Sequence, residues 1–318
     1  MSAVARLSLD VMEGVHLGRY TSLRVGGPAR RFLASADLAA LAQVLDAAVQ
    51  DELPILVLGG GSNLLIADEG FDGVVVRYTA TGHRIETEPG GGLLIRAAAG
   101  VNLSNLARRL AHEGLGGLEW AASVPGTVGG AVVNNSGAFG GCTAEHLVDA
   151  EIVGTDGVVR IIGADDLQYA YRASTLKHGD LGPVVVRSAR LRVHREEPEV
   201  AKGRILTYQN QRTASQPRQL SAGSIFANPP GDYAGRLIEA AGLKGERRGG
   251  AEISAQHANF IVNSGSASAA DVIGLIRLMQ DEVWGRFGLW LRPEVQLVGG
   301  WDPAIVGALA GPPQQAAS

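Results

Sequence analysis

One stretch of this chain, residues 123–138, restricts its fold more than any other; it reads SVPGTVGGAVVNNSGA. The stretch is rich in small residues and contains no charged side chain. A backbone with so few bulky side chains can approach a ligand closely and can turn where φ is positive. Its N–H groups can face the acceptors of a phosphate or a ring. A second glycine-rich turn, VLGGGSNLL, lies upstream at 57–65. The two turns together predict one large, phosphate-bearing cofactor held between them.

Neither turn fits the common nucleotide-binding patterns. A P-loop needs Lys and then Ser or Thr directly after its last glycine, but Gly61 is followed by Ser62 and Gly130 by Ala131. A Rossmann fingerprint needs three glycines in G-x-G-x-x-G spacing, and Leu64 stands where the third glycine belongs. Each turn taken alone also fits an ordinary tight turn. The pair favours a cofactor site of another kind.

Length and composition limit the class of protein. A chain of 318 residues, 46% hydrophobic and 19% charged, is typical of a core-forming protein with roughly two or three domains. A net charge of −4 argues against a general nucleic-acid binder. The single cysteine, Cys142, excludes an internal disulfide framework and a cysteine-based metal cluster, so we expect no metal. We find neither a leader-like N-terminus nor a membrane-length apolar stretch, and therefore expect a cytoplasmic protein.

Periodicity and turn residues predict alternating helices and strands. The segment Ser35-Ala36-Asp37 offers a cap for a first helix, and Ser268 with Asp271 offers a capping box for the last. Thr155-Asp156-Gly157 predicts a hairpin. We expect helices at 38–49, 103–110, 233–241 and 268–284, and strands at 55–58, 74–77, 93–98, 151–153, 158–162, 184–193 and 295–298. The polar segment 194–219 is predicted to be a connection into a different domain.

Short motifs follow one another in a fixed order along the chain. They are TSLRVGGPA at 21–29, GGGSNLL at 59–65, SVPGTVGGAVVNNSGAFG at 123–140, YRAS at 171–174, GSIFANP at 223–229, AAGLKG at 240–245, HANF at 257–260 and LRPEV at 291–295. Any one is a weak signal. All of them in this order resemble the UDP-N-acetylmuramate dehydrogenase family, also called UDP-N-acetylenolpyruvoylglucosamine reductases. The resemblance covers nearly the whole chain, and the compact stretch around Tyr171 is similar to the family's shorter second type.

The resemblance implies an α+β fold with two FAD-binding subdomains of the vanillyl-alcohol-oxidase (PCMH) type and a C-terminal α/β substrate-binding domain. It places the first subdomain at 1–76, to which 292–310 returns, the second at 77–195, the substrate-binding domain at 203–291 and a disordered tail at 311–318. In this family the glycine runs hold FAD. The residues thereby assigned to the cofactor are Gly59, Gly60, Gly61, Ser62, Asn63, Ser123, Pro125, Gly126, Gly129, Gly130, Ala131, Asn135 and Gly137.

The resemblance also implies FAD-dependent reduction of UDP-N-acetylglucosamine enolpyruvate to UDP-N-acetylmuramate, with NADPH as co-substrate, in peptidoglycan precursor synthesis. Hydride addition to a double bond conjugated to a carboxylate builds negative charge, which needs a cation or donor. Arg172 fits because a guanidinium can grip a carboxylate with two hydrogen bonds. Glu294 fits if it is protonated, and Ser224 matches the family's proton donor. Taken singly, Arg172, Glu294 and Ser224 also fit a surface ion pair, a solvated loop residue and a turn residue.

The substrate carries a diphosphate and a carboxylate, so its site should present hydrogen-bond donors. The candidates are Tyr171, Asn228, Lys244, His257 and Asn259. A structural hydrogen bond suits His257 better than acid–base catalysis. Many relatives have Lys or Arg between the Phe and Asn of the Gly-Ser-x-Phe-x-Asn-Pro segment, where this chain has Ala227. The missing cation weakens phosphate or NADPH binding unless another residue, such as Arg236 or Lys244, replaces it.

Two other functions stay open from the sequence. The first is an FAD oxidase or dehydrogenase of the same fold with a different substrate; such proteins often tether flavin through His or Cys, and Cys142 lies just past the glycine run. The second is a non-catalytic nucleotide-sugar or flavin-binding protein, which has no need of a proton donor. The expected partners are the enolpyruvyl substrate and NADPH, without nucleic acid or membrane insertion. We expect a monomer or a weak oligomer.

Overall fold

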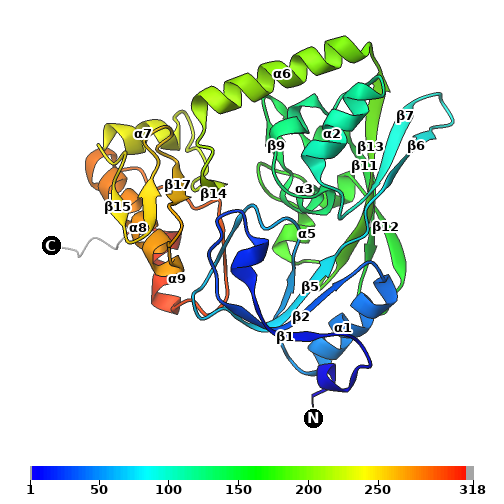
Figure 1. The fold of residues 1–318 in the computed structure, drawn as a ribbon, viewed down its shortest axis with the longest axis horizontal. Helices are drawn as coiled ribbons and strands as arrows, with labels where there is room; N and C mark the ends of the chain where they lie inside the picture. Colours follow the sequence, from blue (N-terminus) through cyan, green and yellow to red (C-terminus); the bar gives the residue numbers. More distant parts are fainter. Residues whose placement is uncertain (1, 313–318) are drawn as a thin grey trace. The chain divides into compact units, whose positions relative to one another are not determined.

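The computed structural model describes residues 2–312 and combines helices with sheets (Figure 1). These residues fall into two compact units. The first comprises the chain up to Glu13, Arg31–Gly60 and Gly73–Arg212, and the second comprises Gly14–Arg30, Gly61–Asp72 and the chain from Thr213 onward. The division into two flavin-binding subdomains and a third domain stays a prediction. Residues 313–318 of the tail expected at 311–318 lie outside the described residues.

A four-stranded sheet is covered by helix α1 (Leu38–Gln50). In sheet order its strands are β1 (Met12–His16), β2 (Pro28–Ser35), β5 (Phe71–Tyr78) and β3 (Ile55–Val57). The carboxylate of Asp37 accepts a hydrogen bond from Ala39 N, as the predicted cap requires. Leu41 and Leu45 of α1 are buried in one cluster with Val74 and Val76 of β5. Strand β3 leads directly into the first glycine turn, as predicted.

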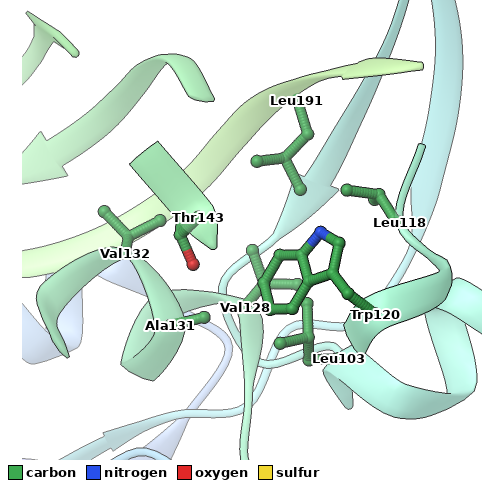
Figure 2. Close-up of a pocket in the computed structure, with 8 residues that line it drawn as sticks. All are labelled: Leu103, Leu118, Trp120, Val128, Ala131, Val132, Thr143 and Leu191. Carbon is green, nitrogen blue, oxygen red and sulfur yellow. The ribbon is translucent and has the colours of Figure 1, made fainter. Parts of the chain in front are cut away.

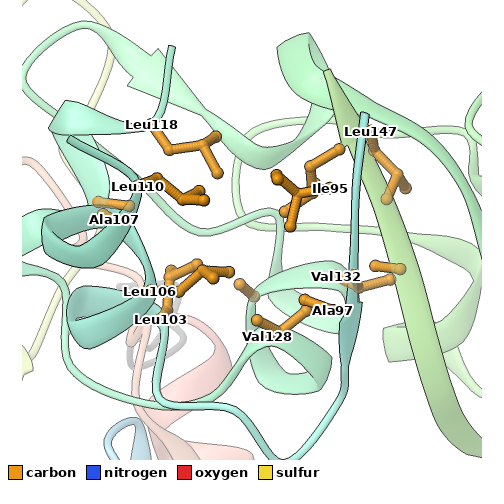
Figure 3. Packing of buried hydrophobic residues seen from close by; sticks show 14 of the residues in the cluster. Ile95, Ala97, Leu103, Leu106, Ala107, Leu110, Leu118, Val128, Val132 and Leu147 are labelled. Atoms are coloured by element: carbon orange, nitrogen blue, oxygen red, sulfur yellow. The ribbon is translucent and has the colours of Figure 1, made fainter. Parts of the chain in front are cut away.

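A larger antiparallel sheet supports the second glycine run. In order its strands are β12 (Val159–Gly163), β11 (Leu147–Val153), β13 (Val185–Arg195), β7 (Leu93–Ala98) and β6 (His83–Thr87), with β8 (Leu115–Gly116) beside β13. The predicted hairpin is confirmed because β11 and β12 pair around residues 155–157. Helices α2 (Leu103–His112) and α3 (Val128–Asn134) pack against β7. Figure 3 shows Leu106 and Leu110 of α2 pointing toward Ile95 and Ala97 of β7.

Short elements and one long helix complete the first unit. The short elements are β9 (Gly137–Ala138), β10 (Gly141–Cys142), α4 (Thr143–His146) and α5 (Thr175–His178). The connection predicted at 194–219 is mostly a helix, α6 (Pro198–Ser215). Arg204 of α6 donates to the buried carboxylate of Glu119 at 2.7 Å and also contacts Glu196. These ion pairs attach a polar helix to the core beside α2.

The second unit is built on a second antiparallel sheet. Its strands, in order, are β14 (Leu220–Ser224), β17 (Phe260–Asn263), β16 (Ala251–Ile253) and β15 (Arg247–Arg248). Its helices are α7 (Ala234–Ala240), α8 (Ala269–Phe287) and α9 (Pro303–Ala310), and β4 (Leu64–Ile66) pairs in parallel with β18 (Gln296–Val298). The predicted capping box of Ser268 and Asp271 opens α8. Within residues 2–312, no helix has both the length and the apolar character to cross a bilayer.

Candidate active site

The two glycine runs approach each other more closely than any side chain allows. A Cβ added to Gly60 meets the Cα of Gly126 at 2.6 Å, and a Cβ added to Gly59 meets Thr127 Oγ1 at 2.9 Å. Thr127 also caps α3, because its hydroxyl accepts a hydrogen bond from Gly130 N at 3.2 Å. Glycine at 59 and 60 is therefore required for the end of β3 to lie against the start of the second run.

Two buried polar atoms in the second run have no hydrogen-bond partner among the described residues. They are the Ser123 hydroxyl and the Asn134 side-chain carbonyl. The same Asn134 amide donates to Gly130 O at 3.1 Å, so its orientation is fixed. A buried acceptor or hydroxyl left unpaired costs stability, and a polar ligand would relieve that cost. These two atoms fit a polar ligand beside the second glycine run.

A small pocket behind α3 offers no such chemistry. Figure 2 shows it between α3 and the indole of Trp120. Its lining is Leu103, Leu118, Trp120, Val128, Ala131, Val132, Thr143 and Leu191. The Thr143 hydroxyl already donates to Ser136 O at 3.0 Å. With no charged side chain in its lining, the pocket is not a phosphate site.

Arg172 is tied to the second glycine run. Its guanidinium donates to Gly137 O at 2.9 Å and to Asn135 O at 3.3 Å, and it lies 5.0 Å from the Tyr171 ring centroid. The backbone of Arg172 has φ +58°, a conformation that non-glycine residues rarely adopt. Lys177 holds this conformation by donating from Nζ to Arg172 O at 2.8 Å. Strain of this kind is retained where the surroundings enforce it, often at functional sites.

The loop that carries Arg172 is clasped to α3. The Tyr169 hydroxyl donates to Val132 O at 2.8 Å, and the Ser174 hydroxyl donates to Val133 O at 2.6 Å. Burial raises the pKa of Tyr169, so it stays a hydrogen-bond donor at neutral pH. Sequence reasoning missed these contacts, because nothing local marks either side chain as a partner of α3.

In the second unit the fold brings Ser224 and Glu294 onto neighbouring segments. Ser224 ends β14 directly after Gly223, whose φ of +78° breaks the register with β17. Glu294 N donates to Ile225 O at 2.7 Å, next to Ser224 in the chain. Asn63 fixes Glu294 from the other side by donating from Nδ2 to Glu294 O at 3.1 Å. Within the described residues the Ser224 hydroxyl has no hydrogen-bond partner.

The predicted substrate-binding side chains differ in what holds them. The Asn259 amide is held by one backbone residue, accepting from Phe226 N at 3.0 Å and donating to Phe226 O at 2.8 Å. Asn228 Oδ1 accepts from Ala234 N at 3.1 Å, at the start of α7. Through these contacts Asn259 and Asn228 position the segment that carries Ser224. Direct contact of either amide with substrate stays a prediction.

The other predicted side chains of this group have contacts of different kinds. Lys244 forms an ion pair with Glu239 at 2.8 Å. The ring of His257 lies edge-on to Phe260, with 4.9 Å between ring centroids, and burial lowers the pKa of His257. Tyr171 belongs to the first unit and is 62% exposed.

Comparisons with known proteins agree with this geometry. The family model described as "FAD binding domain" matches residues 29–163, and the one described as "UDP-N-acetylenolpyruvoylglucosamine reductase, C-terminal domain" matches residues 216–298. The predicted FAD-binding module, and with it the α+β fold class, is thereby confirmed.

Relatives match over most of their length. A UDP-N-acetylenolpyruvoylglucosamine reductase of Chloroflexus aggregans is 46% identical over 89% of this chain and 95% of its own. One from Symbiobacterium thermophilum is 42% identical over 89% of this chain and 90% of its own. The crystal structure of the reductase from Thermus caldophilus superposes with a TM-score of 0.75 at 36% identity, covering 91% of this chain and 98% of that one. The chain thus belongs to the UDP-N-acetylenolpyruvoylglucosamine reductase family.

Proposed function

We propose that this protein reduces UDP-N-acetylenolpyruvoylglucosamine to UDP-N-acetylmuramate with NADPH and FAD, in the cytoplasmic synthesis of peptidoglycan precursors. Family membership supports the reaction. The observation that carries the chemistry is the adjacency of Ser224 and Glu294, because the Ser224 hydroxyl has no partner among the described residues. Ser224 and Glu294, which we propose as proton donor and acid, thus lie on two neighbouring segments that are paired through their backbones.

The chemistry that FAD would supply when bound is hydride transfer from NADPH to the methylene carbon of the substrate. The residues that we propose to hold FAD are the glycine turn at 59–63 and the run at 123–137. Gly59 and Gly60 let the first turn lie directly against Gly126 and Thr127, so that the two runs stand side by side. Ser123 and Asn134 contribute the two buried polar atoms that have no partner in the described chain.

The chain's own residues then stabilise charge and supply a proton. Hydride addition moves the double-bond electrons toward the neighbouring carbon and its carboxylate. Arg172 provides the fixed cation for that carboxylate. Protonated Glu294 donates a hydrogen bond to the same developing charge. Ser224 gives its hydroxyl proton to the neighbouring carbon, and a proton from solvent restores the hydroxyl. The net reaction consumes one hydride and one proton.

An anaerobic spectrum of the purified protein tests both halves of the proposal. NADPH should bleach the flavin band, and the enolpyruvyl substrate should restore it. Ser224→Ala should keep the bleaching and lose the recovery, because only the second half-reaction needs the proton. Recovery at the wild-type rate in Ser224→Ala would show that Ser224 is not the donor. Bleaching without recovery in the wild type would assign the flavoprotein to another substrate.

A further inference from the structure

The backbone of Arg292 pairs with that of Ala227. Phe226 and Pro293 form an isolated antiparallel bridge, and Ala227 N donates to Arg292 O at 3.0 Å. In such a pairing, positions 227 and 292 face each other and their side chains leave the same side of the pair. The Cβ atoms of facing residues are about 5 Å apart. The Arg292 side chain therefore leaves the backbone beside the methyl group of Ala227, which cannot neutralise the charge of the guanidinium.

Arg292 is an exposed cation on an anchored segment. Leu291 is 0% exposed and Val295 is 4% exposed, so the segment is held in the core on both sides. Arg292 itself is exposed, and within residues 2–312 its guanidinium has no hydrogen-bond or ion-pair partner. The backbone that carries the Arg292 guanidinium is thus fixed, two residues before Glu294.

The two cations that the sequence offers as replacements are already engaged. Arg236 donates from Nε to Asp232 at 2.6 Å, and a second guanidinium nitrogen contacts the other carboxylate oxygen. Lys244 pairs with Glu239 at 2.8 Å. Each pair is neutral as a whole. Neither leaves a net positive charge near Ala227.

We infer that Arg292 supplies, from the facing segment, the cation that is missing at Ala227, and that it binds a phosphate group of a nucleotide ligand. The inference rests on the proposed function, because both reactants then carry phosphates: the diphosphate of the UDP-sugar and the phosphates of NADPH. A guanidinium binds phosphate through paired hydrogen bonds and keeps its charge at all working pH values. A phosphate held there is bound by the same segment that carries Glu294.

Titration with UDP alone tests the inference without turnover. Arg292→Ala should raise the Kd for UDP about tenfold, as expected for loss of one charge-assisted contact, and Arg292→Lys should keep most of the affinity. The matched control is Arg286→Ala, which removes an exposed arginine of the same unit that pairs with Glu282. That control should bind UDP like the wild type. The flavin spectrum of each variant verifies that it is folded and loaded.

A reciprocal variant makes the test sharper. Placing the cation back at the facing position, in the double variant Ala227→Arg with Arg292→Ala, should restore the affinity. If the phosphate belongs to NADPH, Arg292→Ala raises the KM for NADPH and leaves UDP binding unchanged. Unchanged binding of both ligands, or a double variant that restores nothing, overturns the inference. Failure of the proposed function is a separate result, because the wild type itself would then give no flavin recovery with the enolpyruvyl substrate.

Discussion

Asn259 provides the most direct test of how this site is built. Asn259 is 3% exposed and Phe226 is 1% exposed, and the amide of Asn259 satisfies both the N–H and the C=O of Phe226. Asn259→Ala leaves both backbone groups buried without a partner. Each such group costs about 1–3 kcal/mol, so we expect a loss of about 2–6 kcal/mol. The loss should appear in the unit that contains Ser224, since Phe226 lies two residues further along.

Urea unfolding measures this loss, with the transition of each compact unit fitted separately. Asn228→Ala is the matched control, because it removes one part-buried amide contact at the start of α7 and should cost about 1 kcal/mol. Asn259→Asp should be more stable at low pH than at neutral pH, because only its protonated form can still donate to Phe226 O. If Asn259→Ala unfolds with the wild type and only raises the KM for the UDP-sugar, Asn259 is a substrate ligand and the structural reasoning is refuted.

Three further results are expected. Gly60→Ala should cost about 1–3 kcal/mol and weaken FAD binding, because its methyl group overlaps the second glycine run; Gly203→Ala, in open space on α6, should cost nothing in unfolding or flavin content. Glu294→Gln should keep more turnover than Glu294→Ala because an amide still donates a hydrogen bond, whereas equal losses would indicate direct proton transfer. Burial lowers the pKa of His257, so the folded state disfavours the protonated ring. The stability that the neutral ring provides is complete above about pH 6.5 and is lost as the pH falls below that value. The melting temperature of His257→Asn should therefore fall less steeply than that of the wild type as the pH is lowered.

The sequence predicted helix starts correctly where the capping interaction involves only neighbouring residues. The cap at Asp37 and the capping box at Ser268 are each completed within three residues, so the sequence contains the whole interaction. Helix α6 was missed for the opposite reason. Only Ala201 and Ile205 of its residues are buried, which leaves no apolar stripe to recognise. Its attachment depends on Arg204 reaching Glu119, 85 positions earlier, and no local pattern reports that contact.

Long-range contacts limit prediction of the site as well. A sequence gives the type of a residue but not whether its polar atoms already have hydrogen-bond partners. Asn63 belongs to a glycine turn predicted to bind cofactor, yet its amide donates across 231 positions to Glu294 O. Asn259 is predicted to bind substrate, and its amide already pairs with both backbone groups of Phe226. Ser224 is the contrasting case, since the register of β14 with β17 shifts at Gly223, just before it, and no described residue accepts its proton. A hydroxyl that donates to the protein must break that bond before it can protonate a carbon. Asn63 and Asn259 thus hydrogen-bond to the backbone around Glu294 and Ser224 and hold it in place. The Ser224 hydroxyl, the proposed proton donor, is not used in this way.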